Sequence, residues 1–346
     1  MFVAGVASCD IWEVDADPRV LVWGQQGDLC GLATNPAFPH VFATCSDSDK
    51  VAVWSAATRK PLRIVSLGGL RGRCCAFSPC GQQLAVGTGC GGLQVLEFHP
   101  AVRQVWWGKP FSGAVSEIKY SPCGTFLAAG SHDQSIEVFD VSRGFTRVCR
   151  CVGHSSAVRH LDWAADSGGL QSVDQAYELL YFDPRTGKQL KTNQRDTRWN
   201  GWSCLLGFPV MGIWFPDSDG TDINAVHASP SGKYVLTADD RGRVRLLNFP
   251  CVVQSAPARE YGGHCSHVMN VRWGADETYA VSVGGKDRAV FQWRLLHPPA
   301  PAASPGRAAL PTPWAQVDEE GIMWAPPRGA QQQVQGGGGQ QGASPG

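Results

Sequence analysis

The sequence lacks the features of several protein classes. It has no run of about eighteen apolar residues, which a membrane helix needs, and it has no basic, apolar leader at its start. Charged residues make up only 17% of its 346 residues, and 30 Lys and Arg balance 30 Asp and Glu without a block of like charge. Because nucleic-acid binding needs clustered Lys and Arg to displace counterions, we expect a soluble protein without a nucleic-acid or membrane partner.

Paired cysteine spacing is absent as well. The 13 cysteines are odd in number and scattered, and the nearest approaches to a motif, Cys74-Cys75 and Cys149-x-Cys151, are not CxxC pairs. In a chain of this length, such a set is typical of reduced, buried thiols in the cytosol rather than of a disulfide framework.

Glycine, proline and tryptophan are frequent, with 41, 23 and 13 residues, and much of this content lies in a repeat. Residues 77–85 (FSPCGQQLA) return as residues 120–128 (YSPCGTFLA), a shift of 43 residues. Related stretches occur at 33–38, 163–170, 229–236 and 273–276, with an insertion of 22 residues before the third of these. A unit of about 43 residues with several strands is typical of one blade of a β-propeller, whereas a β-sandwich would give irregular spacing.

Each unit predicts the same order of strands. An apolar strand ends in a Ser-Pro-x-Gly type of turn, a second apolar run follows, and a third strand alternates and ends in an apolar, mostly aromatic, residue. These third strands end near Trp12, Trp54, Val95, Phe139, Phe182, Phe249 and Trp293. We therefore predict an all-β, WD40-type propeller over residues 1–296, with about six blades and a partial first blade whose last strands come from residues 1–14. Either the ring closes with this imperfect blade or a missing N-terminal segment completes it, and we favour the second.

The last unit carries the most complete blade signature. His264 precedes its first strand, Ser282 lies in the second, Asp287 in the following turn, and Trp293 ends the third. In WD repeats such a set forms a buried hydrogen-bond chain that holds a loop to the sheet. Because buried polar groups are tolerated only when they have partners, we interpret these four residues as structural rather than catalytic.

Several stretches of the chain carry a family resemblance. Residues 31–36 (GLATNP), 72–79 (GRCCAFSP), 153–163 and 261–273 resemble echinoderm microtubule-associated protein-like proteins, and residues 214–224 are the most specific part of the match. The resemblance covers about residues 2–295 and implies microtubule binding by two joined propellers that follow an oligomerising coiled coil and a basic region. The sequence is similar to the second, C-terminal propeller alone, so the resemblance implies tubulin-related scaffolding in the cytoplasm and on the microtubule cytoskeleton.

The predicted function is thus a non-catalytic microtubule-associated scaffold that binds tubulin or microtubule-bound proteins, and the alternative is a general WD-repeat adaptor unrelated to tubulin. Because tubulin is acidic, basic rim residues are candidates for contact, and the insertion between Phe182 and Ala225 adds aromatic ones. A solvated basic face, and tryptophans that pack over a blade, are the alternatives. The candidates are Arg59, Lys60, Arg63, Arg71, Arg73, Trp199, Trp202, Arg241, Arg243 and Arg245.

Signals for catalysis and for bound cofactors are weak. Residues 87–92 (GTGCGG) resemble a dinucleotide loop but join two predicted strands instead of opening a helix. Residues 217–222 lack the distal Glu of a calcium loop, and residues 264–267 (HCSH) lack the second pair of ligands that zinc needs. We expect no enzymatic activity, no metal, no cofactor and no small-molecule substrate.

The composition changes at residue 297. Of the 50 residues in 297–346, 9 are Pro and 9 are Gly, which predicts a disordered tail. One stretch from Pro313 to Ala325 combines tryptophans with Asp318, Glu319 and Glu320. It is either a short partner-binding motif or a linker with incidental tryptophans.

Overall fold

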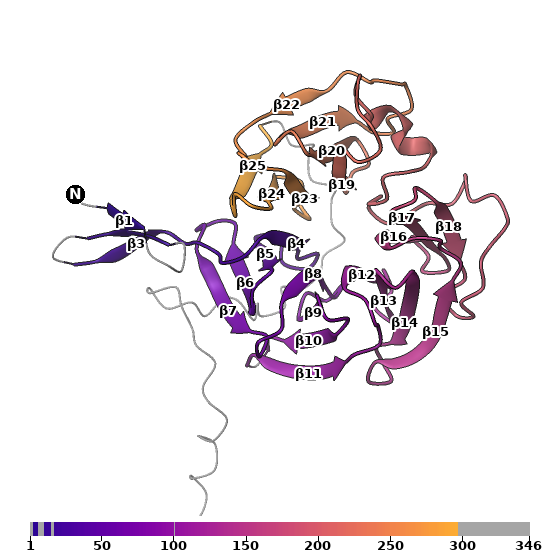
Figure 1. Cartoon of the computed structure of the whole chain (residues 1–346), viewed down its shortest axis with the longest axis horizontal. Helices are drawn as coiled ribbons and strands as arrows, with labels where there is room; N and C mark the ends of the chain where they lie inside the picture. Colours follow the sequence, from indigo (N-terminus) through magenta and orange to yellow (C-terminus); the bar gives the residue numbers. More distant parts are fainter. Residues whose placement is uncertain (1–2, 6–9, 15–16, 100, 297–346) are drawn as a thin grey trace, which may run out of the picture.

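The computed structural model describes residues 3–5, 10–14, 17–99 and 101–296, and strands dominate this part of the chain. Six antiparallel sheets stand around a central axis as the blades of a propeller (Figure 1). We number these blades 1 to 6 in chain order. The predicted fold class, an all-β propeller of about six blades plus a partial one, is confirmed.

Four blades have four strands each. Blade 1 consists of β4 (Leu29–Thr34), β5 (Val41–Ser46), β6 (Lys50–Ser55) and β7 (Pro61–Ser66). Blade 2 consists of β8 (Gly72–Phe77), β9 (Gln83–Thr88), β10 (Leu93–Glu97) and β11 (Arg103–Gly108). Blade 3 consists of β12 (Val115–Tyr120), β13 (Phe126–Ser131), β14 (Ser135–Asp140) and β15 (Thr146–Val152). Blade 5 consists of β19 (Ile223–Ala228), β20 (Tyr234–Asp239), β21 (Val244–Asn248) and β22 (Arg259–Tyr261).

Blades 4 and 6 have three strands each. Blade 4 consists of β16 (Val158–Trp163), β17 (Leu170–Asp174) and β18 (Leu179–Phe182), and blade 6 consists of β23 (Val268–Trp273), β24 (Tyr279–Gly284) and β25 (Val290–Arg294). A 3₁₀ helix, η1 (Phe208–Ile213), lies in the long connection between blades 4 and 5. This helix is far too short to cross a membrane, and no helix among the described residues is both long enough and apolar enough to span one.

The first strands of the chain lie outside the ring. β1 (Val3–Gly5), β2 (Ile11–Glu13) and β3 (Arg19–Val22) form a separate three-stranded sheet whose side chains are mostly exposed. This sheet contains residues of the predicted partial blade, but it stands beside blade 1, outside the ring, instead of taking a place in it (Figure 1). Residues 297–346, the predicted tail, lie outside the described residues, so the domain boundary at 296/297 stays a prediction.

The ring closes where blade 6 packs on blade 1. The Leu29 amide donates to the Gly285 carbonyl at 3.2 Å, and the Thr34 hydroxyl donates to the Trp273 carbonyl at 2.8 Å. The Tyr279 hydroxyl also donates to the Pro39 carbonyl at 2.6 Å. These bonds join residues near the two ends of the described chain, so the closure depends on tertiary packing and not on local sequence.

The innermost strand of every blade carries a bulge at its second residue. The pairing register shifts at this point in β4, β8, β12, β16, β19 and β23. The bulged residues are Cys30, Arg73, Ser116, Arg159, Asn224 and Met269. A bulge leaves one residue out of the ladder and redirects its side chain. The six equivalent bulges therefore lie at the same end of the innermost strands, and we call this end of the ring the channel mouth.

The twelve described cysteines are all free thiols, but not all of them are buried. Cys80, Cys90, Cys123 and Cys265 are exposed, which corrects the prediction of a wholly buried set. These four lie in turns or connections between strands, where side chains point to solvent.

Candidate protein-binding surfaces

His264, Ser282, Asp287 and Trp293 form a hydrogen-bonded chain in blade 6. The two ring nitrogens of His264 lie 2.9 Å from an Asp287 carboxylate oxygen and 2.8 Å from the Ser282 hydroxyl, and Trp293 Nε1–H donates to the same hydroxyl at 2.8 Å. Burial lowers the pKa of His264, and the hydrogen bond and charge of Asp287 only partly offset that effect. Both ring nitrogens of the buried His264 have partners, so the hydrogen-bond chain ties the residues before β23 to the sheet.

Blade 4 contains a similar set around His154, which the sequence comparison of blades did not identify. His154 bonds to the Ser172 hydroxyl at 2.7 Å and lies 3.2 Å from an Asp174 oxygen. Phe182 packs on the imidazole in place of the usual tryptophan. Together with Glu178, His154 and Asp174 form a group of metal-capable atoms within 4.8 Å of one another. Because the histidine and Asp174 are already engaged in the blade, this arrangement matches a structural tetrad.

The central channel holds buried charges that are paired with one another. Arg272 on β23 reaches Glu117 on β12 at 3.5 Å, and Lys119 lies 3.5 Å from the same carboxylate. The Asp162 carboxylate accepts hydrogen bonds from the Trp163 and Ser203 amides at 2.9 and 3.1 Å. Burial raises the pKa of Asp162 to about 7. The two carboxylates that converge on the axis are thus used to hold inner strands and the blade 4–5 connection together.

Two basic side chains, Arg71 and Arg73, lie at the channel mouth, the end of the ring where the bulges lie. Arg71 and Arg73 line a hollow of about 490 Å³ with His132 and Cys90. The Arg71 side chain is 71% exposed and lies 3.5 Å from Asp47, a distance at which an exposed pair contributes little stability. Partial burial and the positive charges of Arg159 and Arg73 lower the pKa of His132.

The remaining basic candidates do not join this hollow. Arg59 and Lys60 are exposed in the turn before β7, and Arg63 lies within β7. Arg71 follows the other end of β7, so a six-residue strand, about 20 Å long, separates Arg59 and Lys60 from Arg71. The basic residues of blade 1 therefore belong to opposite ends of the blade.

Blade 5 contradicts part of the predicted contact set. Arg245 is buried, and its guanidinium bonds to Asp239 at 3.1 Å and to Glu260 at 3.2 Å. It also stacks on the Phe215 ring, with Arg241 on the same ring at 4.6 Å. Arg245 is therefore a structural residue and does not reach a partner, whereas Arg241 and Arg243 remain exposed.

The tryptophans of the insertion fill the junction between blades 4 and 5. Trp202 is buried, donates from Nε1 to the Cys204 carbonyl at 2.9 Å and packs near Phe249. Trp199 is half-buried, stacks on Tyr181 and forms a bridge to Ala164. The prediction that Trp202 contacts a partner is therefore wrong, because its indole is part of the core. Part of the Trp199 side chain is exposed, so its contact with a partner stays a prediction.

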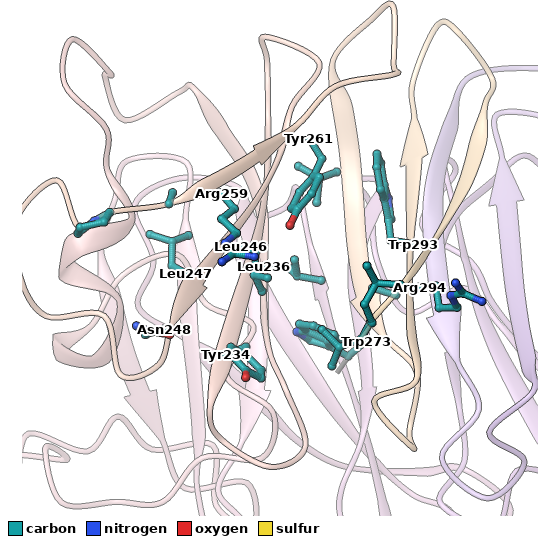
Figure 2. A pocket seen from close by; sticks show the side chains of 16 residues that line it. Tyr234, Leu236, Leu246, Leu247, Asn248, Arg259, Tyr261, Trp273, Trp293 and Arg294 are labelled. Carbon is teal, nitrogen blue, oxygen red and sulfur yellow. The ribbon is translucent and has the colours of Figure 1, made fainter. Parts of the chain in front are cut away.

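A second hollow is a groove between blades 5 and 6, and no pattern in the sequence indicated it. Its volume is about 710 Å³, and its walls are mostly aromatic and aliphatic (Figure 2). The wall on blade 5 includes Leu246, Arg259 and Tyr261, and the wall on blade 6 includes Trp293 and Arg294. The residues come from strands that are unrelated in local sequence, so only the packing of the blades brings them together.

Comparison with known proteins gives the family. Residues 29–295 match the family model described as the second beta-propeller of the echinoderm microtubule-associated protein. Human echinoderm microtubule-associated protein-like 2 is 42% identical over 286 residues, which cover 80% of this chain and 43% of the relative. Human echinoderm microtubule-associated protein-like 3 is 39% identical over 310 residues, which cover 86% of this chain and 34% of the relative. The chain thus spans less than half the length of these relatives.

A chain in a crystal structure of the mitotic checkpoint complex has the same fold, with a TM-score of 0.60 at 15% identity over 82% of this chain and 94% of that chain. This likeness concerns the fold alone. The descriptions of the matched family and of the two relatives name a microtubule-associated protein and no enzyme. From the family match, which covers the whole ring of blades, we conclude that the chain belongs to the echinoderm microtubule-associated protein family and corresponds to its second β-propeller.

Proposed function

We propose that this propeller is a non-catalytic scaffold of the cytoplasmic microtubule cytoskeleton, and that it binds tubulin or a microtubule-bound protein through the basic channel mouth. The observation that carries the proposal is the convergence of Arg71 and Arg73 on one hollow. The family match supplies the kind of partner, since the relatives are named for microtubule association.

The charge of the mouth fits an acidic partner. Net charge over the whole chain is zero, so a local group of arginines stands out from the overall balance. Basic groups that converge on a concave surface attract an acidic segment and increase its rate of association, and salt weakens both effects. An acidic, extended segment of tubulin is the ligand class that this surface fits.

A microtubule cosedimentation assay with the full chain, together with a pull-down of unpolymerised tubulin, tests the proposal. We expect Arg71→Glu/Arg73→Glu to weaken binding by about tenfold or more at low salt. Arg59→Glu/Lys60→Glu is the matched control, because it changes the net charge by the same amount on the opposite end of blade 1 and leaves the channel mouth intact.

Three outcomes separate the hypotheses. Loss of binding in the first variant but not in the control supports the mouth as the contact surface. Equal loss in both variants would show a diffuse charge effect and refute the assigned site. Binding of neither tubulin form by the unmodified chain would overturn the tubulin proposal and favour a general adaptor that recruits other proteins.

A further inference from the structure

Blade 6 has an open outer edge beside the groove. In blades 1, 2, 3 and 5 a fourth strand follows the third strand along the chain and pairs with it antiparallel. In blade 4, residues next to β18 partly take this place, since Gln189 bridges to Phe182 and the Leu190 amide donates to the Tyr181 carbonyl. No strand among the described residues pairs with the outer edge of β25.

The open edge explains the groove. The Leu295 amide donates to the Thr278 carbonyl, so the alternation of an antiparallel ladder turns the amides of Gln292 and Arg294 toward the open side. Without a fourth strand, the face of blade 5 opposite this position has nothing to pack on. Leu296 is 69% exposed and Tyr261 is 37% exposed, so two large apolar side chains that line the same hollow keep much of their surface in water.

The walls also present unpaired polar groups. Arg259 faces the groove from blade 5 and forms no ion pair with a described carboxylate (Figure 2). The Nε1–H of Trp273, on a side chain that is only 3% exposed, has no acceptor among the described residues. An occupant that is apolar and acidic would satisfy both kinds of surface.

We propose that residues 314–324 of this chain dock in the groove and pair along β25 as the fourth strand of blade 6. In the complete blades the fourth strand comes from the residues that follow the third, and residues 297–346 follow β25. Between 297 and 313 prolines recur too often for a strand, because proline cannot donate to a ladder. Residues 314–325 (WAQVDEEGIMWA) are the first stretch of twelve without proline.

Charge and length fit the same segment. Asp318, Glu319 and Glu320 lie between Trp314 and Trp324, so a docked segment would bring carboxylates to the Arg259 guanidinium and indoles to the apolar walls. The groove begins at Leu295 and Leu296 themselves. The 18 residues from Leu296 to Trp314 reach up to about 60 Å when extended, so they can return to the groove. Tethering at this distance gives an effective concentration on the order of millimolar.

Amide hydrogen exchange at Gln292 and Arg294 in the full chain tests the docking. We expect both amides to exchange about tenfold more slowly in the unmodified protein than in Trp314→Ala/Trp324→Ala, because pairing removes them from water. The matched control is Gln331→Ala/Gln332→Ala/Gln333→Ala, which alters the same tail outside the docking segment and should keep the slow exchange.

A charge exchange adds a second, independent measurement. Arg259→Glu should speed exchange at residues 292 and 294, and Asp318→Lys/Glu319→Lys/Glu320→Lys should do the same. The combination of both sets should restore slow exchange, because the ion pairs re-form with opposite polarity. A chain that merely lost stability would not be rescued by a second set of charge changes.

The other possible occupants give distinct results that would overturn the proposal. Slow exchange that appears only at high protein concentration would indicate a second copy of the chain. Slow exchange that survives the tail variants but disappears when residues 1–24 are deleted would assign the groove to the N-terminal segment. Equally fast exchange in all proteins would show that the edge stays open.

Discussion

The two sides of blade 5 break the regular packing of the propeller in opposite ways. Toward blade 4, residues 199–205 enter the junction, and Ser203 bonds through its amide to Asp162 and through its hydroxyl to the Leu161 carbonyl. Toward blade 6, the inner strands pack well, but the outer strands leave a groove of about 710 Å³. One irregularity is filled by the chain itself, and the other is open to an occupant.

The two junctions differ in how much of their surface is exposed to water. At the blade 4–5 junction, the backbone of the insertion replaces solvent with hydrogen bonds, and Trp202 and Leu205 add apolar burial. At the blade 5–6 junction, the outer side chains keep their exposure, so little free energy of folding depends on them. A sealed junction contributes to stability, whereas an open one is available for binding.

The largest expected effect is at the sealed junction. Trp202→Ala should lower the free energy of unfolding by about 3–5 kcal/mol, because it removes a buried indole and leaves a cavity next to Phe249. Urea denaturation measures the change. Trp199→Ala is the internal comparison, and since Trp199 is only half-buried its expected cost is about 1–2 kcal/mol. Equal costs for the two variants would mean that the junction is not sealed as described.

The inner part of the blade 5–6 junction should respond to acid. The Trp273 amide donates to His227 Nδ1 at 3.0 Å, and burial, with the charges of Arg272 and Lys119, holds the pKa of His227 well below its usual 6.5. The unfolded chain therefore binds a proton that the folded chain does not, and stability falls as the pH falls below about 6.5.

His227→Asn keeps an acceptor for the Trp273 amide and removes this titration. The slope of unfolding free energy against pH between about 6.5 and 5 should then decrease by about 1.4 kcal/mol per pH unit. His160, whose pKa burial lowers to about 3, acts in the same direction, and Asp162 acts in the opposite one, but both are present in either protein. Denaturation curves at several pH values give the slope, and identical slopes would contradict the role of His227.

The smallest expected effect is at the open groove. Leu296→Ser should change the free energy of unfolding by no more than about 0.5 kcal/mol, because the leucine is already 69% exposed. Urea denaturation of Leu296→Ser and Trp202→Ala under the same conditions compares the loss of unfolding free energy at the two junctions. A loss above about 1 kcal/mol would show that the groove wall contributes to stability and would contradict the contrast between the two junctions.

The repeat was readable from the sequence because its signals are local. The turn at residues 78–81 and the apolar strands on either side of it are set by neighbouring residues, and the same holds for the third strand that ends at Trp54. The tetrad around His264 was also readable, since its members sit at fixed places in one unit. The tetrad around His154 was less visible because Phe182 replaces the tryptophan that marks the pattern.

The position and exposure of the candidate contact residues could not be predicted from the sequence to the same degree. Residue type alone grouped Arg71 with Arg59 and Arg245, yet one lies at the channel mouth, one at the opposite end of blade 1, and one is buried between two carboxylates. Exposure and direction of a side chain depend on what packs around it, which residue type does not specify.

The amino-acid sequence by itself determined the blade unit, the approximate number of blades and the family, because strand alternation and turn chemistry act over a few residues. Tertiary structure alone decided which junction is sealed and which is open. Ser203 meets Asp162 across 41 residues of chain and His227 meets Trp273 across 46, so these contacts exist only after whole blades have packed around the axis.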